Sequence, residues 1–301
     1  MKHDAYQTIT NTIVDLIETH GTGWVKPWIG NGGTARRPIS ISTGKAYQGI
    51  NPILLWSAGF ADHRWGTYKA WQDKGCQVRA GQKAGAYIVF FKSLEIKDKE
   101  TGDGKKIPFL RQTAVFNAEQ VEGVEPLPVP EAPETPAEAD ERVKAALDFA
   151  HATGADIRVT VGSDRAFYSP LSDKIVVPAI TDFVGTPTSS AQECFAATLL
   201  HELVHWSGHR SRLDRVKGLA FGDEAYAAEE LVAELGATFL CSDLQISAEP
   251  RADHAQYIAS WLKALKNDKR LIVRAASAAS KAAEYLHSLQ ADSPAATQVA
   301  A

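Results

Sequence analysis

The residues best suited to chemistry in this sequence lie in the segment His201-Glu-Leu-Val-His205, which matches the pattern HExxH. Four residues are close to one helical turn, so on a helix both imidazoles leave the same face and can share one metal ion. Glu202 occupies the position from which a carboxylate accepts a proton from metal-activated water. The segment therefore predicts a metal site for hydrolysis, with Glu202 as the catalytic base.

Because HExxH also occurs by chance, this interpretation depends on a third ligand from elsewhere in the chain. The segment 226–240 is a predicted helix whose small side chains would let it approach the first helix closely. Glu230 is the expected ligand, with Glu229 as the alternative, because the sequence does not fix the helix phase to within one residue. Glu234 is expected to accept the free ring N–H of a ligating histidine. Two histidines and one glutamate are typical of catalytic Zn²⁺, and another divalent cation such as Mn²⁺ would also fit.

Two further polar residues accompany these segments, His209 and Tyr226. His209 continues the row formed by the first two histidines, but three imidazoles spread over two turns do not converge on one ion. The sequence also lacks the histidine six residues after His205 that a metzincin would have. We therefore expect His209 to cap the helix end or face the cleft, with His209 or Tyr226 as a transition-state stabiliser.

The composition bounds the class of protein. A chain of 301 residues is long enough for two domains with separate cores. No apolar run reaches the roughly 18 residues of a membrane helix, and residues 1–10 contain no apolar signal segment. The three cysteines are far apart and form no CxxC pair, which argues against a disulfide framework. A cytoplasmic protein without a membrane partner is expected.

Charge and aromatic residues are distributed unevenly. Residues 1–116 carry 16 Lys and Arg against 9 Asp and Glu, a net charge of +7, which leaves −11 for the remainder. Five of the seven tryptophans fall within the first 71 residues. Aromatic faces stack on bases and cations follow phosphates, so a single-stranded nucleic acid is the predicted partner. The candidate DNA-binding residues are Trp24, Lys26, Trp28, Arg36, Arg37, Tyr47, Asn51, Arg64, Trp65, Lys69, Arg79 and Lys83.

Two alternatives qualify this interpretation of the first part. For Trp56, Trp65 and Trp71, burial in the core is at least as well favoured as DNA contact. Recognition of a specific duplex sequence ranks well below single-strand binding, because no predicted helix has the arrangement of a base-reading element.

The order of predicted elements indicates an α+β fold of two domains. A helix at 5–20 and strands at 76–79, 87–94 and 107–116 belong to a first domain at 1–121, which we expect to bind the single-stranded nucleic acid. A proline-rich, acidic linker is expected at 122–141 and a disordered tail at 291–301. Between them, residues 142–290 follow the order of a zincin-like metallopeptidase, with strands before the HExxH helix. Either Phe167–Ser169 or Ile175–Val177 would be the edge strand that binds extended peptide.

Several segments together resemble the ArdC family, the antirestriction proteins of conjugative plasmids, over about residues 1–290. The first half is also similar to plasmid TraC-type primases. The segments are YQGIN (47–51), RWGTYKAW (64–71), VRAGQKA (78–84), HELVHWSGH (201–209) and YAAEELVAELGATFL (226–240). The resemblance implies an N-terminal domain that binds single-stranded DNA, a metallopeptidase-like C-terminal domain, and protection of incoming plasmid DNA from host restriction.

Two functional hypotheses follow. In the first, the protein shields single-stranded DNA without sequence specificity and the zincin-like domain is structural or regulatory. In the second, it is a zinc metallopeptidase that DNA binding delivers to host restriction proteins or other DNA-associated proteins. Glu202 distinguishes the two, because only the second needs a catalytic base.

Overall fold

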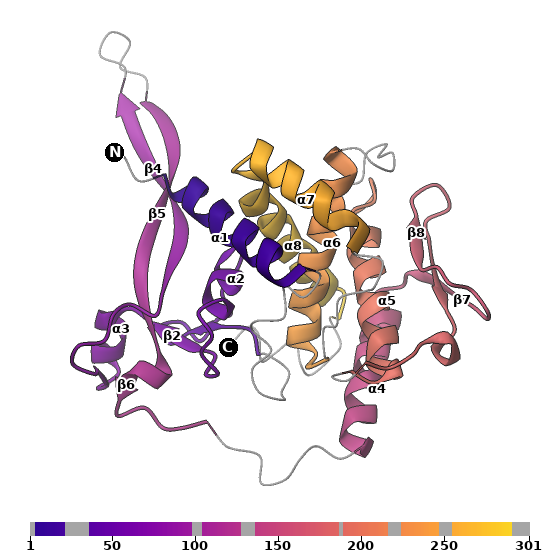
Figure 1. Cartoon of the computed structure of the whole chain (residues 1–301), viewed down its shortest axis with the longest axis horizontal. Helices are drawn as coiled ribbons and strands as arrows, with labels where there is room; N and C mark the ends of the chain where they lie inside the picture. Colours follow the sequence, from indigo (N-terminus) through magenta and orange to yellow (C-terminus); the bar gives the residue numbers. More distant parts are fainter. Residues whose placement is uncertain are drawn as a thin grey trace.

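The computed structural model describes residues 4–21, 36–97, 104–127, 136–186, 189–215, 224–246 and 255–290. Strands and short helices accompany α1 (Ala5–His20) in the first part and helices dominate the second, which confirms the α+β class (Figure 1). The elements of the first part are α1 (Ala5–His20), β1 (Ile39–Ser40), α2 (Asn51–Trp56), β2 (Arg64–Gly66), α3 (Tyr68–Asp73), β3 (Gln77–Val78), β4 (Ala86–Lys97), β5 (Gly104–Asn117), η2 (Ala118–Gln120) and β6 (Val121–Glu122). Those of the second part are α4 (Pro136–Ala152), β7 (Asp156–Thr160), β8 (Phe167–Ser169), β9 (Lys174–Pro178), η3 (Ile180–Asp182), α5 (Ala191–Ser207), α6 (Glu224–Asp243), α7 (Ala255–Asn267) and α8 (Leu271–Ser288).

The first part is built around the long antiparallel hairpin of β4 and β5, which pair from Ala86↔Val115 to Lys97↔Gly104. β5 also pairs with β2, and β2 pairs in parallel with β1, so the sheet order is β1-β2-β5-β4. β4 is therefore an edge strand, and Figure 1 shows the hairpin rising along one side of the molecule.

The second part consists of a helical core with a small sheet packed against α5. The sheet order is β7-β9-β8, with β9 parallel to β7 and antiparallel to β8. Ile175 and Val177 of β9 are fully buried. Because β9 is hydrogen-bonded on both sides, the prediction that 175–177 could be a peptide-binding edge is wrong. Of the two segments considered, only β8 lies at an edge.

One apolar core joins the two parts. Ile9, Ile13 and Ile17 of α1 belong to the same buried cluster as the apolar residues of α5, α6, α7 and α8. α1 packs against α7, and Lys269 of the segment after α7 forms an ion pair with Asp4 at 2.6 Å. Figure 1 accordingly shows α1 between the hairpin and the C-terminal helices. The hairpin and the helical core are thus connected by buried side chains as well as by the chain.

The start of α4 differs from the boundary that the sequence predicted. α4 begins at Pro136, inside the segment expected to be a linker, because proline is compatible with the first turn of a helix and Glu138 suits its positive end. α2 begins at Asn51 after Ile50, and no side chain caps it. Among the described helices, none is both long enough and apolar enough to cross a membrane.

Candidate metal centre

The helix that carries HExxH, α5, begins with a reciprocal cap. The side chain of Ser190 accepts a hydrogen bond from the backbone N–H of Glu193, and the side chain of Glu193 accepts one from the backbone N–H of Ser190. This satisfies two N–H groups that a helix start would otherwise leave unpaired. His201 and Glu202 are 4% and 3% exposed. α5 therefore places its motif inside the core, where polar groups need partners.

Those partners come from α6, which lies close to α5 because its contact surface is made of small residues. A Cβ atom added at Gly236 would lie 2.8 Å from both methyl carbons of Val204, and Ala233 is fully buried. A larger residue at 236 would force the helices apart. The close approach of α6 to α5 that the small residues predicted is therefore present. Gly236 lies against Val204 of α5 at this contact.

Three side chains meet at this crossing. Nε2 of His201 lies 3.6 Å from Oε2 of Glu230, and Nε2 of His205 lies 3.4 Å from its Oε1. One ligand atom from each of the three residues lies within 4.8 Å of the others. Two atoms bound tetrahedrally at about 2.0–2.1 Å from one ion would be roughly 3.4 Å apart, so the spacing and the donor types fit a divalent cation.

A second layer of carboxylates lies behind the imidazoles. Oε2 of Glu234 is 3.7 Å from Nδ1 of His201, and Oε1 of Glu229 is 3.3 Å from Nδ1 of His205. A carboxylate at Nδ1 favours the tautomer whose Nε2 is free for an ion. Glu229, the alternative third ligand, therefore faces the outer nitrogen of His205, while Glu230 faces the inner nitrogens of both rings.

Arg215 holds Glu229 in this position, and the sequence did not indicate it. Its Nε and Nη2 atoms lie 3.0 and 2.9 Å from the two carboxylate oxygens of Glu229, and Nη2 also donates to the carbonyl of Val204 at 2.7 Å. Such a two-pronged pair fixes both the position and the plane of the carboxylate. The only trace in the sequence is that Arg215 lies shortly after the HExxH helix.

The charges of these groups shift their proton affinities strongly. Burial alone lowers the pKa of His205, but hydrogen bonds to Glu229 and Glu230 outweigh it and raise the pKa to about 10. The pKa of His201 also rises, because Glu230 and Glu234 outweigh burial. Burial raises the pKa of Glu230, yet the two histidines lower it well below its ordinary value. Since an imidazole ligand must be neutral, a cation and protons compete for this cluster.

His209 and Tyr226, the candidate transition-state stabilisers, lie outside the group of three side chains that could hold an ion. Nδ1 of His209 accepts a hydrogen bond from the backbone N–H of Ser211 at 3.3 Å, in the turn that follows α5. Tyr226 lies near the start of α6 and is half-buried. Among the described residues, the group able to hold an ion comprises the two HExxH histidines and Glu230. The side chain of His209 thus bonds within the turn after α5, and its role at the site stays a prediction.

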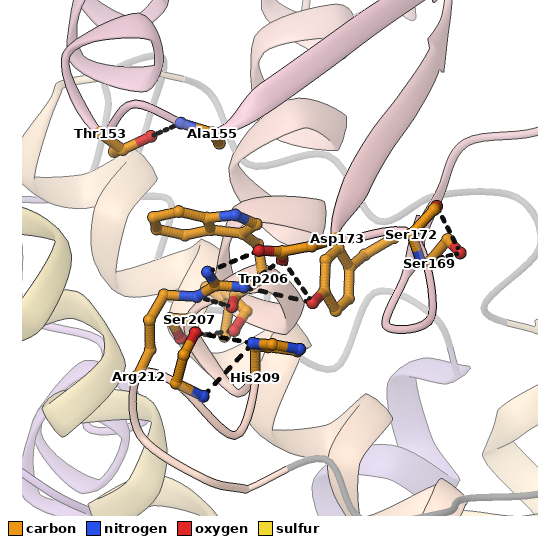
Figure 2. A network of polar contacts seen from close by, with 12 residues as sticks. Thr153, Ala155, Ser169, Ser172, Asp173, Trp206, Ser207, His209 and Arg212 are labelled. Carbon is orange, nitrogen blue, oxygen red and sulfur yellow. Dashed lines mark hydrogen bonds and ion pairs between the residues drawn. The ribbon is translucent and has the colours of Figure 1, made fainter.

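A further network ties the end of α5 to the edge strand β8 (Figure 2). The guanidinium of Arg212 lies over the ring of Trp206, 3.9 Å from its centroid, and pairs with both carboxylate oxygens of Asp173. The hydroxyl of Tyr168, in β8, donates to Asp173 at 2.8 Å. Burial and the bond to Asp173 raise the pKa of Tyr168. The sequence did not indicate these four residues as a unit, because they come from three separate segments.

The candidate DNA-binding residues do not gather into one site. Trp24, Lys26 and Trp28 lie outside the described residues. Several of the cations are exposed and are spread over different elements: Arg36, Lys69, Arg79 and Lys83. Arg79 donates to the carbonyl of Glu119.

Other candidates have structural partners. Arg37 is 8% exposed and pairs with Asp243 at 3.1 Å, while Trp65 is 1% exposed. Their prediction as DNA contacts is corrected, since a buried guanidinium and a buried indole offer no surface to a strand. Burial of these two residues depends on α6 and on the sheet, which local sequence does not reveal.

The remaining three candidates are also committed to the fold. Arg64 forms a two-pronged pair with Asp62. The side chain of Asn51 bonds both backbone groups of Val89, at 2.7 and 2.8 Å. Tyr47 is half-buried, and burial raises its pKa. These side chains anchor loops and the hairpin edge, so their expected role at a DNA surface is not supported by their positions.

Comparison with known proteins finds relatives for both parts of the chain. Residues 3–116 match the N-terminal domain of anti-restriction factor ArdC, and residues 144–278 match a zincin-like metallopeptidase family. The antirestriction protein ArdC of plasmid R388, in a metal-free crystal structure, is 39% identical over 96% of this chain and 99% of that one, with a TM-score of 0.78. The chain belongs to the ArdC family. A Mn(II)-bound structure of the R388 protein matches with a TM-score of 0.73 and 37% identity over 96% of this chain and 99% of that one.

Two other relatives extend the ArdC family likeness. The uncharacterized protein y4eC of Sinorhizobium fredii is 38% identical over 96% of this chain and 93% of its own length. The DNA primase TraC of Escherichia coli is 36% identical over 95% of this chain. This chain spans 20% of that primase, so the likeness concerns one part of TraC.

Proposed function

We propose that this protein is an antirestriction protein that binds single-stranded DNA without sequence specificity and protects incoming plasmid DNA from host restriction in the cytoplasm. The observation that carries the proposal is the end-to-end likeness to ArdC of plasmid R388, which covers 99% of that chain at 39% identity. The likeness includes both domains, so it supports an activity that uses both.

The metal centre is the second element of the proposal. His201, His205 and Glu230 are the proposed ligands of a divalent cation, Zn²⁺ or another such as Mn²⁺, supported by their 3.4 and 3.6 Å spacings. A cation bound there would act as a Lewis acid and lower the pKa of a bound water. Glu229 and Glu234 would hold the two rings with Nε2 directed inward.

A second candidate function is peptide hydrolysis directed at DNA-associated host proteins. It is favoured by Glu202, which is buried and whose charge acts on both histidines of the cluster. From this position its carboxylate would accept a proton from an attacking water and deliver it to the leaving amine. The edge strand β8, which packs against α5, would align an extended peptide by strand addition.

Glu202→Gln tests the proposal against this second function. Plasmid transfer is measured into recipients with and without a restriction system, with the wild type, the variant or no protein expressed. If shielding protects the DNA, the variant retains wild-type protection; transfer reduced to the level without the protein would make hydrolysis the protective act.

Two controls complete this experiment. Glu284→Gln removes the same charge from an exposed position of α8 and should change nothing. Metal content of purified Glu202→Gln should equal that of the wild type, because Glu202 is not a proposed ligand. A wild-type protein that gives no protection in the restricting recipient contradicts the antirestriction proposal as a whole.

A further inference from the structure

The β4–β5 hairpin carries aromatic rings on its surface where a folded protein would normally bury them. Phe90 and Phe109 are 37% and 42% exposed. Lys92 and Arg111 are exposed as well. In the part of the chain that the structure describes, neither cation forms an ion pair. We call Phe90, Lys92, Phe109 and Arg111 the hairpin quartet.

The register of the hairpin places the quartet on one face. Phe90 pairs with Arg111, and Lys92 pairs with Phe109. Directly opposite residues share a face, and so do residues two apart along a strand. Rings and cations therefore alternate in a two-by-two square, with each ring opposite a cation. Nζ of Lys92 lies 5.9 Å from the centroid of the Phe90 ring.

Neighbouring rungs of the hairpin toward the body of the domain are packed, although Tyr87 and Phe91 on the opposite face are 56% and 58% exposed. Val115 is fully buried, and with Ile88 it packs in the cluster of Leu55 and Trp65. On the opposite face Val89 is 5% exposed and belongs to the main core. The quartet begins at the next rung after Val89, with Phe90 and Arg111.

The chemistry of this face selects its occupant. Exposed rings supply flat apolar surfaces for bases, and the cations between them suit phosphates. The side chains described on the hairpin, at 86–92 and 109–117, include no acidic residue. A second copy of the chain would bring like charges together, which disfavours a symmetric contact through this face.

We propose that the hairpin quartet is a contact surface for single-stranded DNA, with Phe90 and Phe109 stacking on bases and Lys92 and Arg111 pairing with phosphates. This inference rests on the proposed DNA binding and gives it a location on the protein. Diagonal neighbours in a β-ladder are roughly 7–8 Å apart, about twice the 3.4 Å rise between stacked nucleotides, so the two rings can bracket one base.

Two double variants test the quartet separately for rings and charges. Binding of a labelled mixed-sequence oligonucleotide of about 16 nucleotides is titrated at several salt concentrations. Phe90→Ala with Phe109→Ala should weaken binding about tenfold or more. Lys92→Gln with Arg111→Gln should reduce the slope of log K against log salt by about 1.4, since each phosphate contact to a single strand contributes about 0.7.

Matched controls use the same chemical changes elsewhere. Phe91→Ala removes an exposed ring from the opposite face of the hairpin, and Lys263→Gln with Lys281→Gln removes two exposed charges from α7 and α8. Both should bind within about twofold of the wild type. Circular dichroism and thermal unfolding of every variant should match the wild type, because the changed side chains are exposed.

The outcomes separate the inference from the proposed function. If the wild type binds but both quartet variants bind equally well, the hairpin assignment is overturned. Equal losses in Phe91→Ala and the ring variant would overturn the assignment to this face. Equal loss of duplex binding in the ring variant would overturn base stacking, since paired bases do not expose their faces. A wild type that binds no single strand contradicts the proposed function itself.

Discussion

The metal centre and the hairpin quartet depart from ordinary protein structure in opposite ways. At the α5–α6 crossing, the ionisable groups His201, Glu229, Glu230 and Glu234 are all at most 7% exposed. On the hairpin, Phe90 and Phe109 are 37% and 42% exposed. Buried charge is costly unless it is paired, and exposed rings forgo the gain of burial. The proposed site for a small ion is thus enclosed within the fold, whereas the proposed surface for a polymer is left open.

The largest expected effect comes from removing the ligand that faces both imidazoles. Glu230→Ala should abolish retention of the metal, because the remaining two nitrogens cannot form the three-ligand set. Glu229→Ala should keep the ion with an affinity reduced about 10–100-fold. Metal content by mass spectrometry, followed by competition with a chelator, measures both. If only Glu229→Ala loses the ion, Glu229 is the ligand and Glu230 is the supporting carboxylate.

The next effect separates buried from exposed aromatic residues. Trp65→Ala should destabilise the fold by about 3–5 kcal/mol, because Trp65 is 1% exposed and packs edge to face on Phe60 at 5.4 Å. Phe90→Ala should change the free energy of unfolding by at most about 0.5 kcal/mol. Urea unfolding of both variants provides the comparison. Wild-type stability in Trp65→Ala combined with lost DNA binding would return Trp65 to the DNA surface.

The smallest effect concerns support of the metal centre from outside the ligand set. Arg215→Gln should lower metal affinity about 10–100-fold, toward the lower end, because Glu229 loses its two-pronged partner but keeps its contact with His205. Arg212→Gln is the matched control, since Arg212 pairs with Asp173 instead of Glu229. Competition with a chelator should distinguish them. Equal losses in both variants would show that the turn after α5 acts through general stability.

The sequence indicated which side chains meet at the α5–α6 crossing because their placement depends on short-range geometry. Spacing at i and i+4 fixes the direction of two side chains on one helix, and the small residues of α6 indicate where a second helix comes close. The choice between Glu229 and Glu230 required the crossing of the two helices, which no local pattern contains. Arg215 was missed for the same reason, since its partner lies on α6.

The N-terminal surface was much harder to predict. An indole or a guanidinium has the same type in the core as on the surface, so its exposure depends on distant segments. Trp65 is covered by the sheet and its neighbours, and Arg37 by α6. The two strands of the hairpin were expected at 87–94 and 107–116, and both are longer in the structure. The exposure of each residue pair in the hairpin depends on where α1 and α2 pack against it. The sequence alone therefore did not indicate that the quartet is exposed.

The packing of α1 against the C-terminal helices limits how the gene can be divided between fusion proteins. Its isoleucines fill the same apolar cluster as α5 and α8, so a piece lacking the first 20 residues would lose part of the other domain's interior. A gene fusion that transferred only one half would expose that interior to water. The TraC relative is a much longer protein, and its matching part aligns with 95% of this chain. This is expected if the two halves are transferred together when they are fused to other proteins.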